Sequence, residues 1–594
     1  MSNTPPQSPR DPSELKFTPQ PMVGWFNPRQ LLSTGVQALL SEVIGSYADK
    51  RELQAALRGN PGPHTDYANS DEIWVDFVAD LGDGFDSTYT VASLLAQPTL
   101  TAEATEETPR GRVLIMGGDQ VYPVARRTEY QNRLHGPYEA ALPYVPDERP
   151  HLFAIPGNHD WYDGLTSFLR VFCQQRGIGA WQTRQSRSYF ALLLPHRWWI
   201  LGTDMQLETD IDQPQLEFFS GVCRDHMQSG DRVILCTAAP TWIDVENGNT
   251  EAYENLSFFE QRVVEQNKAR LVVTLTGDLH HYARYESTGV SATRHKITAG
   301  GGGAFLAGTH DLPRSLTLPR GESEEHYDRA TIYPTEKTSR RLALGAVGFL
   351  LRNGWFAVLL GSLYLFYAWL IQSGSQRAGS LSFMTEVADK PLGEWRPVLA
   401  SVWRILVHNP GVVAMFSLVV AGLALFSVPE RPGWWRAVVA RLAGAMHGVA
   451  HILLAVGLVW WFATLDRAYL TPVLGSSIPA TVRTAIESTL FSAAMLVIGS
   501  VAGGMLMGAY LILANQLLGL HRSDVFASQS IPDFKNFLRL HVAKDGTLTI
   551  RAYGVDRVCR KWRFNANAQP GEPWMVPEQG QRLTARLIDR VVVM

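Results

Sequence analysis

Three polar residues, Asn158, His159 and Asp160, directly follow an apolar run and a Pro156-Gly157 stop. The run before the stop has the length and composition of a buried strand. In an open α/β sheet, binding and reacting side chains gather at the carboxyl ends of the core strands. The block therefore predicts a chemical site; the alternative is a polar turn whose side chains cap the next helix.

The same arrangement occurs three more times, so four apolar runs are each followed by Asp, Asn or His. The other runs and their polar residues are 74–79 with Asp80 and Asp83, 113–116 with Asp119, and 271–276 with Asp278 and His280. Side chains of these types bind divalent metal ions, and a two-metal site needs a carboxylate between the ions. Strands alternating with helical stretches from about residue 71 to 310 predict an α/β domain that brings these residues together.

The order of these motifs resembles that of the calcineurin-like metallophosphoesterases. The matching residues are Asp80, then Gly118-Asp119, then Gly157-Asn158-His159-Asp160, and last Gly277-Asp278-Leu279-His280. The runs SYADKRE, PGNHDWYDG, GDLHHYARY and TAGGGGAF are similar to a membrane-associated branch of the family found in plants and bacteria. The resemblance covers about residues 20–330 and 521–565. It implies an α/β fold, a four-layer metallophosphoesterase sandwich with two central sheets flanked by helices.

The resemblance also implies a role for each metal-binding motif. Asp119 would bridge two metal ions, Asp80 and His280 would hold the first ion, and Asn158 would hold the second. The implied cofactors are one or two divalent ions (Mn, Fe, Mg or Zn), whose bound hydroxide would attack phosphorus in line.

Three further residues are expected near the substrate. His159 is expected to act as a general acid or as an electrostatic partner of the phosphate, held by Asp160. Arg284, which follows the last motif, is expected either to contact phosphate or to form a structural salt bridge.

The chain departs from the family pattern in three places. Gly82 replaces the histidine of the first motif, and Asp83 is expected to supply an oxygen ligand instead. Asp278 replaces the first histidine of the last motif, and its carboxylate still binds metals. Ala238, in the run TAAP, replaces a ligand histidine with a methyl group, so an oxygen-rich site is expected that favours Mn or Mg over Zn. Two spare imidazoles lie nearby in the sequence, at His281 and His310.

Composition and the remaining soluble segments add weaker expectations. The net charge of -3 and pI near 6.6 give no reason to expect a nucleic-acid partner. The 4 cysteines are scattered without ligand spacing, which favours a reducing compartment. Residues 1–20 are expected to be a disordered tail. Residues 21–70 contain a helical pattern at 28–47, which is expected to pack on the catalytic domain (71–330) because it has few basic residues for lipid binding. The polar stretch 311–338 is expected to be a linker.

Four uncharged spans follow, and each exceeds the ~20 residues that cross a bilayer core. The spans are 353–376, 405–429, 442–465 and 488–520. They predict a four-helix transmembrane domain at 339–520, the alternative being four buried helices of a large soluble domain. The glycines of the last span predict close helix packing; they are Gly499, Gly503, Gly504 and Gly508. Residues 521–594 are predicted to contain a β-hairpin with an Asp545-Gly546 turn, which the resemblance implies packs on the catalytic domain.

Four crossings put both soluble ends on one side of the membrane, and nine basic residues flank that side against six on the other. This bias predicts an integral protein of the inner or plasma membrane with its catalytic domain in the cytoplasm. His447 and His451 lie four residues apart in the third span, hence on one helix face. They mark either an ion or proton path or an interior pair satisfied by neighbouring helices.

Taken together, the sequence predicts a membrane-anchored, metal-dependent phosphoesterase. Its substrate would be a phosphomonoester or phosphodiester, either a small molecule or a lipid, and the oligomeric state stays open. The alternative, favoured by Ala238, is a catalytically impaired sensor of a phosphorylated ligand coupled to the membrane domain. A transporter or channel with a regulatory domain is less favoured, because the spans show a histidine pair but no chain of ionisable groups.

Overall fold

The computed structural model describes residues 8–45, 64–102, 106–205, 211–289, 293–321, 323–377, 382–429, 431, 433–475, 478–578 and 583–594. The chain forms two compact units. Unit 1 comprises Met1–Val23, Leu32–Ser339 and Ser530–Met594, and unit 2 comprises Gly24–Leu31 and Arg340–Gln529. Unit 2 is therefore an insertion whose chain both leaves and re-enters unit 1.

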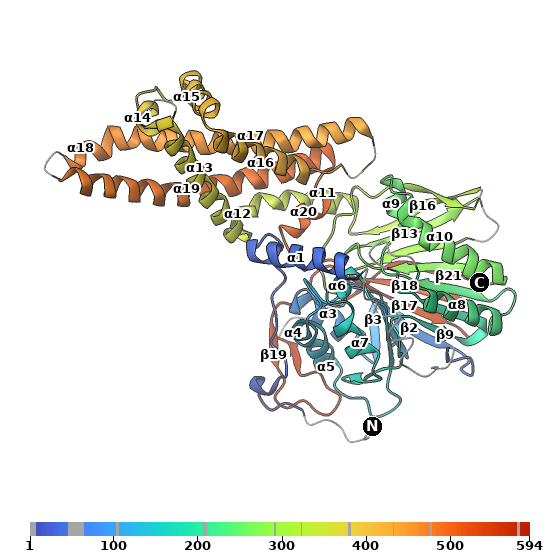
Figure 1. The fold of residues 1–594 in the computed structure, drawn as a ribbon. Coiled ribbons are helices and arrows are strands. Elements are labelled where there is room, and N and C mark those ends of the chain that lie inside the picture. Colours follow the sequence, from blue (N-terminus) through green and yellow to red (C-terminus); the bar gives the residue numbers. More distant parts are fainter. Residues whose placement is uncertain are drawn as a thin grey trace. The chain divides into compact units, whose positions relative to one another are not determined.

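Unit 1 is built around two large sheets, which Figure 1 shows edge on. In spatial order the first sheet contains β1 (Thr65–Asp66), β9 (Phe190–Leu193), β10 (Trp198–Gly202), β11 (Arg232–Cys236), β12 (Arg270–Thr276), β14 (His295–Ala299), β13 (Tyr282–Thr288), β16 (Ser323–Tyr333) and β15 (Ser315–Arg320). The second contains β21 (Arg586–Val593), β18 (Leu548–Val555), β17 (Lys535–Val542), β2 (Ile73–Val78), β5 (Val113–Met116), β6 (His151–Ala154), β8 (Trp181–Thr183) and β7 (Gly177–Ile178). Two small hairpins pair β3 (Thr99–Ala102) with β4 (Glu106–Pro109) and β19 (Trp562–Phe564) with β20 (Met575–Pro577).

The central strands are buried along most of their length because both of their faces are covered. In β5, Val113 and Ile115 face the other sheet, whereas Leu114 and Met116 face helices. β2, β5 and β6 run parallel, as do β11 and β12, so their carboxyl ends lie at a common edge of each sheet. This arrangement places the polar residues that follow these strands near one another.

Helices cover the outer faces of both sheets and complete the four α/β/β/α layers. On the second sheet lie α3 (Phe85–Ala96), α5 (Gly136–Ala141) and α7 (Thr166–Phe172), and on the first lie α8 (Gln213–Asp225), α9 (Trp242–Glu246) and α10 (Glu254–Phe258). Two short helices, α4 (Arg127–Glu129) and α6 (Asn158–Trp161), lie in the connections. Three hydrophobic clusters separate the layers, which confirms the predicted α/β sandwich.

The chain that returns from unit 2 enters the centre of the second sheet. β17 and β18 form the antiparallel hairpin, and β17 pairs directly with β2. Arg539 of β17 is fully buried and forms two hydrogen bonds with the buried carboxylate of Asp76 in β2, at 2.7 and 3.1 Å. The returning segment is thus an internal part of the catalytic fold.

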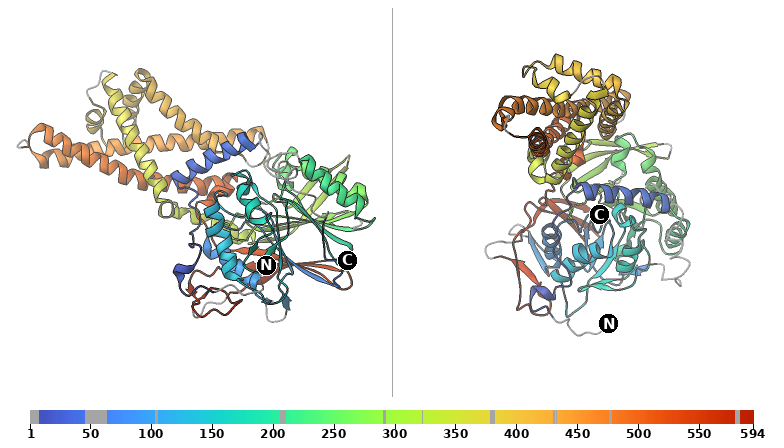
Figure 2. Two further views of the ribbon diagram at one scale, coloured as in Figure 1. Left: turned by 60° about the horizontal axis from the view of Figure 1, so that its bottom comes forward. Right: turned by 60° about the vertical axis from the view of Figure 1, so that its left-hand side comes forward.

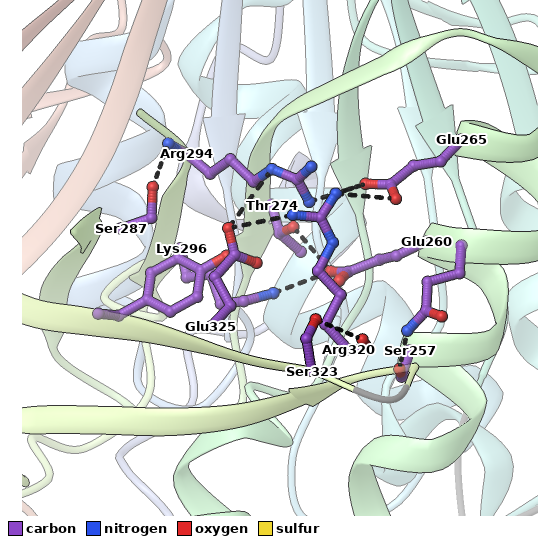
Figure 3. Close-up of polar contacts among 12 residues, drawn as sticks. Ser257, Glu260, Glu265, Thr274, Ser287, Arg294, Lys296, Arg320, Ser323 and Glu325 are labelled. Atoms are coloured by element: carbon purple, nitrogen blue, oxygen red, sulfur yellow. Dashed lines mark hydrogen bonds and ion pairs between the residues drawn. The ribbon is translucent and has the colours of Figure 1, made fainter. Parts of the chain in front are cut away.

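A buried ion-pair network stabilises the outer face of the first sheet (Figure 3). Glu260 accepts hydrogen bonds from Lys296 Nζ at 2.9 Å and from the Tyr253 hydroxyl at 2.9 Å. The ammonium group of Lys296 also lies about 5 Å from the ring centres of Trp242 and Tyr253. Both charges are therefore compensated where helices meet the sheet, which is the condition for burying them.

Two expectations for the soluble segments were wrong. Residues 315–320 and 323–333 form β15 and β16 at the sheet edge, so the predicted linker at 311–338 is largely strand. Its charged residues alternate with buried ones such as Tyr327, the period-two pattern of a half-covered edge strand. Within the expected disordered tail, Phe17 is buried against Phe85, with ring centroids 6.1 Å apart; residues 1–7 lie outside the described part.

The predicted amphipathic helix forms as α1 (Pro28–Gly45), and residues 46–47 lie outside the described part. Its expected packing on the catalytic domain is not found for the apolar residues Leu31, Leu32 and Val36, which are exposed. Helix α11 (Glu336–Ala343) connects unit 1 with unit 2.

Unit 2 is helical. Its helices are α12 (Phe349–Arg352), α13 (Gly354–Arg377), α14 (Phe383–Ala388), α15 (Trp395–His408), α16 (Pro410–Phe426), α17 (Trp434–Leu465), α18 (Thr471–Leu474), α19 (Ala480–Leu518) and α20 (Arg522–Ala527). Among the described residues, three helical stretches are long and apolar enough to cross a membrane: Gly354–Ser375, Trp434–Leu474 and Ala480–Leu518. Figure 1 and Figure 2 show α13, α17 and α19 as the long helices of this unit.

The predicted second span at 405–429 is not one straight helix. It is split into α15 and α16, which meet at an angle of 110°. Pro410 causes the break, because proline lacks an amide hydrogen and its ring clashes with the preceding turn. The Asn409 side chain bonds the Gly374 and Ile405 carbonyls at the corner, at 2.8 and 2.9 Å.

The predicted packing role of the glycines in α19 is confirmed. A methyl group on Gly503 would lie 3.0 Å from the Tyr364 hydroxyl oxygen, and one on Gly499 would lie 3.1 Å from the Tyr364 ring. The absence of side chains at these positions lets α13 and α19 approach closely around Tyr364.

Candidate metal centre

Loops from both sheets of unit 1 meet at the carboxyl ends of the parallel strands. The residues they carry are Asp80 after β2, Asp119 after β5, Asn158 after β6, Ala238 after β11, and Asp278 and His280 after β12. Backbone hydrogen bonds join the loops: Asp80 N–H donates to the Gly118 carbonyl at 3.0 Å, and Gly277 N–H donates to the Ala238 carbonyl at 2.8 Å. The Asp278 N–H donates across the two sheets to the Asp80 carboxylate at 3.0 Å.

The Tyr122 hydroxyl lies at the centre of this cluster. Its oxygen is 3.0 Å from Oδ1 of Asp80, 3.1 Å from Oδ2 of Asp119 and 3.0 Å from Nε2 of His280. One hydroxyl carries one proton, so it donates to one of these groups at a time. Two carboxylates and an imidazole therefore surround the phenol hydroxyl of Tyr122.

Asn158 and Asp278 form the more open side of the cluster, and both are half-buried. The Asn158 amide nitrogen donates to the Tyr162 hydroxyl at 3.3 Å, so the amide oxygen is the atom that remains available to a ligand. That oxygen is buried and has no hydrogen-bond partner among the described residues, and the same is true of Oδ2 of Asp80.

The backbone at the three carboxylates is strained. Asp80, Asp119 and Asp278 have φ values of 56°, 49° and 65°, in the left-handed region that side chains other than glycine seldom adopt. Such conformations persist where the surrounding fold imposes them, and they cluster at functional sites. The strained backbone at these three carboxylates lowers the stability of the fold, and the surrounding contacts hold it in this conformation.

Glycines make room for the carboxylates. A methyl group on Gly157 would lie 2.1 Å from Oδ1 of Asp119, and one on Gly300 would lie 2.3 Å from Oδ2 of Asp80. Both positions therefore require glycine for the neighbouring carboxylate to keep its place.

The electrostatics of the cluster favour a cation. Burial raises the pKa of Asp119 to about 7, and burial together with the Asp119 charge raises the pKa of Asp278 to about 7. Burial and the same neighbouring charges hold the pKa of Asp80 well above its usual range. Three buried carboxylates repel one another, and a positive ion among them would remove that repulsion.

His159 lies at the edge of the cluster and is held by a backbone carbonyl. Its Nδ1 lies 2.8 Å from the Pro123 carbonyl oxygen; a carbonyl only accepts, so Nδ1 carries the proton. Burial lowers the pKa of His159, which favours the neutral ring. The His159 amide N–H also donates to Oδ1 of Asp119 at 2.9 Å.

Asp160 does not hold His159 as expected. Its buried carboxylate accepts hydrogen bonds from the backbone of Gly157 and Gln120 and from the Tyr130 hydroxyl. Asp160 thus connects the loop that carries His159 to the loop that carries Asp119. It is a positioning residue for both.

Asp83 also has a structural role in place of the expected ligand role. Its Oδ1 accepts from Val23 N–H at 2.7 Å, and its Oδ2 accepts from Phe305 N–H at 3.1 Å. Both oxygens are thereby used to attach the N-terminal segment and the glycine-rich loop to the site.

Arg284 forms the structural salt bridge that was the alternative to a phosphate contact. Its guanidinium pairs with Asp589 of β21 at 2.6 Å and with Glu286 at 2.6 Å. The bond to Asp589 joins β13 of the first sheet to the edge strand β21 of the second sheet.

Gly82 and Ala238 mark the two positions where the family pattern has histidine. A methyl group on Gly82 would lie 2.4 Å from the Gln120 carbonyl oxygen, so no side chain fits there, and Tyr122 supplies the extra group near Asp80 instead. Ala238 is buried, and a methyl group added to Gly118 would lie 2.8 Å from the Cβ of Ala238. Position 238 is therefore next to the Asp119 loop, and its methyl group supplies no ligand.

The two spare imidazoles differ. His281 is buried, and neither of its ring nitrogens has a hydrogen-bond partner among the described residues; burial lowers its pKa to about 4. His310 bonds the Ser339 hydroxyl at 2.8 Å and is a loop residue of unit 1.

The donor types at this site, which are carboxylate, amide, phenol and imidazole, fit a divalent metal ion. Within the described ranges, no group of three or more His, Cys, Asp and Glu side chains is arranged so that it could hold one. The Tyr122 hydroxyl, itself an oxygen donor, lies between Asp80, Asp119 and His280. The unpartnered oxygens of Asp80 and Asn158 add two further donors that burial without a partner makes costly.

Tyr122 is the functional residue that sequence reasoning missed. It follows Asp119 by three residues in the same loop, and the signal was a polar aromatic so soon after a motif carboxylate.

Comparisons with known proteins found one family and one solved structure that resemble part of the chain. Residues 73–282, from β2 to the start of β13, match the model of the calcineurin-like phosphoesterase family. A solved purple acid phosphatase from yellow lupin (Lupinus luteus) seeds is similar at 12% sequence identity with a TM-score of 0.28. The match covers 44% of this chain and about half (48%) of that one, and at this level we base no argument on it. No curated protein matches the chain.

Proposed function

We propose that the protein is a membrane-anchored, metal-dependent phosphoesterase, and the match of residues 73–282 to the calcineurin-like phosphoesterase family supports this proposal. The observation that carries the proposal is the convergence of Asp80, Asp119, Tyr122 and His280 from two sheets on one point. The substrate is a phosphomonoester or phosphodiester, on a small molecule or a lipid.

We assign the ligands from the donor set. Asp80, Asp119, Tyr122 and His280 would hold one ion, and Asn158 and Asp278 would join Asp119 at a second. This set is rich in oxygen, which favours hard ions such as Mn, Mg or Fe. A bound ion supplies charge neutralisation at the phosphate and activation of water for attack on phosphorus.

His159 serves the leaving group or a phosphate oxygen. The Pro123 carbonyl fixes its Nδ1–H, so Nε2 is the nitrogen that remains for substrate. Phosphate and leaving-group oxygens accept hydrogen bonds, so Nε2 would first take up a proton from solvent, and the resulting imidazolium would donate that proton to the leaving-group oxygen. Asp160 acts only by holding the backbone that presents His159.

A second candidate function is a catalytically impaired sensor of a phosphorylated ligand, and Ala238 is the observation that favours it. The discriminating experiment is the Ala238→His variant. We expect it to bind more metal by elemental analysis and to hydrolyse bis(para-nitrophenyl) phosphate about tenfold faster than wild type, one ligand being worth ~1.4 kcal/mol at the barrier.

Ala239→His is the matched control, because it adds the same imidazole one residue further along on a half-buried position. It should change neither metal content nor rate. Metal-free wild type together with an Ala238→His protein that gains neither metal nor rate would leave the sensor as the better proposal.

The connectivity of unit 1 restricts how unit 2 crosses a membrane. β2 precedes unit 2 and β17 follows it, yet the two strands are paired in one sheet. The chain must therefore leave and return on one side, which requires an even number of crossings. The three long helices alone would give an odd number of crossings. We therefore propose that α16, with 17 residues, is the fourth crossing and that α15 lies along the membrane surface. We place unit 1 in the cytoplasm, at the inner or plasma membrane.

Cysteine labelling tests this topology. The four native cysteines are buried, so single cysteines introduced at exposed sites should be labelled alone. Val473 lies in α18 and is 82% exposed. In sealed vesicles of one orientation, Lys544→Cys in unit 1 and Val473→Cys should react with a membrane-impermeant maleimide from opposite sides. Labelling of both from one side would contradict four crossings.

A further inference from the structure

A chain of polar side chains runs through the apolar interior of unit 2. It begins at Asp524, whose carboxylate accepts from Nδ1 of His521 at 2.9 Å. Nε2 of His521 lies 3.2 Å from the Tyr510 hydroxyl and 3.4 Å from the Ser427 hydroxyl. The two hydroxyls also bond each other. Asp524 is part-exposed, whereas His521 and Ser427 are buried.

The chain continues on α17 and α13. The Tyr510 ring stacks on the imidazole of His447, with centroids 3.8 Å apart. Nε2 of His447 lies 2.9 Å from Nε2 of His451, and Nδ1 of His451 bonds the Tyr364 hydroxyl. The sequence predicted the histidine pair alone; the structure adds the ionisable groups on either side of it.

One ring nitrogen in this series of polar side chains has no hydrogen-bond partner among the described residues. His447 is 4% exposed, and its Nδ1 has no hydrogen-bond partner among the described residues. If Tyr364 donates to His451, then His451 donates through Nε2 to His447, and His447 must carry its proton on Nδ1. If every bond is reversed, Nδ1 of His447 is a bare acceptor. The two hydrogen-bond patterns differ by the passage of one proton along the chain.

The chain reaches the middle of the membrane unit. Tyr364 lies ten residues inside α13, which at 1.5 Å per residue is roughly 15 Å, half of the ~30 Å hydrocarbon core. From the other end of the unit, a cavity of about 860 Å³ extends between α13, α17 and α19. It is lined by Leu365, the residue next to Tyr364, and by the half-buried carboxylates Asp466 and Glu487.

The outer part of the cavity has the chemistry of a proton entrance. Asp466 opens a π-helical turn, Asp466–Leu470, that interrupts the continuous helix after α17. Such turns recur at functional sites because they widen the helix and turn side chains inward. Ionisable groups inside membrane segments are costly and mark proton or ion pathways.

We propose that unit 2 conducts protons across the membrane along Asp524, His521, Tyr510 with Ser427, His447, His451 and Tyr364, and through the cavity that holds Asp466 and Glu487. One proton enters at one end as one leaves at the other, so each group returns to its original charge. Within the pair, His447 takes a proton at one ring nitrogen and releases one from the other, and His451 does the same. Two steps have no direct hydrogen bond, from the Tyr510 hydroxyl to Nδ1 of His447 and from the Tyr364 hydroxyl to the cavity. At each of them a water molecule would accept the proton on one side and give one up on the other.

The test measures proton flux with the full-length protein in liposomes. The vesicles contain a pH-sensitive dye, potassium with valinomycin compensates charge, and the outside is acidified. Wild-type vesicles should acidify faster than protein-free vesicles. His447→Phe, which keeps the stacked ring but has no nitrogen, should reduce the protein-dependent rate about tenfold or more, because one relay site is lost.

Two further variants provide a second test of the relay and a matched histidine control. Tyr364→Phe removes a single hydroxyl from the other end of the relay, keeps the ring that packs against Gly499, and should reduce flux equally. His408→Phe, at the exposed end of α15, is the matched histidine control and should conduct like wild type. Thermal melting by circular dichroism checks that each variant is folded.

The outcomes separate a pathway from an interior histidine pair. Wild-type vesicles that acidify no faster than protein-free ones would overturn the proposal. Folded His447→Phe or Tyr364→Phe protein with wild-type flux would overturn it too, because the relay would then carry no protons. Phosphoester hydrolysis in unit 1 is not needed for this result, so the two proposals stand or fall separately.

Discussion

Replacing Asp119 with asparagine is expected to reduce phosphoester hydrolysis about a thousandfold, a loss of ~4 kcal/mol at the barrier. Asp119 contacts both Tyr122 and the loop that carries His159: its Oδ2 lies 3.1 Å from the Tyr122 hydroxyl, and its Oδ1 accepts from His159 N–H at 2.9 Å. Asparagine keeps the size and the hydrogen bond to His159 but loses the charge that would hold ions on both sides. Hydrolysis of bis(para-nitrophenyl) phosphate and elemental analysis of the purified protein measure the effect.

The same substitution should raise the thermal stability of the protein in excess chelator. Without a cation, Asp80, Asp119 and Asp278 are buried together and repel one another, and the neutral amide removes the central charge. Loss of activity with a gain of stability is the behaviour of a residue placed for function. Asp225→Asn, at a fully exposed position, is the control and should alter neither quantity. Asp119→Asn protein with wild-type metal content and activity would contradict the proposed centre.

Replacing Arg539 with methionine is expected to destabilise unit 1 by about 3–5 kcal/mol, the range for breaking a buried ion pair. Arg539 is 0% exposed and Asp76 is 2% exposed, so the variant leaves an uncompensated carboxylate inside the sheet. Arg539 also donates to the Thr108 carbonyl at 2.9 Å, a bond that methionine cannot replace. Hydrogen–deuterium exchange of the amides in β2 and β17 should accelerate sharply.

Arg560→Met provides the matched comparison. Arg560 pairs with Asp533 at 2.7 Å, but its side chain is 56% exposed, so water compensates both charges when the pair is lost. Its effect should stay within about 0.5 kcal/mol. Equal exchange in the two variants would mean that the Arg539 pair does not stabilise the junction between β2 and β17.

The site illustrates what local sequence patterns reveal. Each of β2, β5, β6 and β12 is a short apolar run that ends at glycine, proline or a carboxylate, and these signals lie within a few residues of one another. The pattern therefore predicted the strands, their carboxyl ends, and Asp80, Asp119, Asn158, Asp278 and His280 as neighbours. The apolar spans of unit 2 could be predicted for the same reason, because an apolar run long enough to cross a bilayer is a property of consecutive residues.

The roles of the remaining polar residues depended on distant partners. Asp83 is 222 residues from Phe305, and Arg284 is 305 residues from Asp589, yet these contacts decide that both side chains are structural. Asp160 likewise bonds Gln120, 40 residues away, in preference to its neighbour His159.

By itself, then, the sequence determined the strands, their polar ends and the membrane-length helices, because each is encoded by consecutive residues. Only the tertiary structure decided that Tyr122 joins the cluster of Asp80, Asp119 and His280, that β17 enters the sheet beside β2, and that His447 and His451 belong to a longer polar chain. The physical reason is that a polar side chain takes its role from whichever group lies within hydrogen-bonding distance, and folding brings those groups from far along the chain.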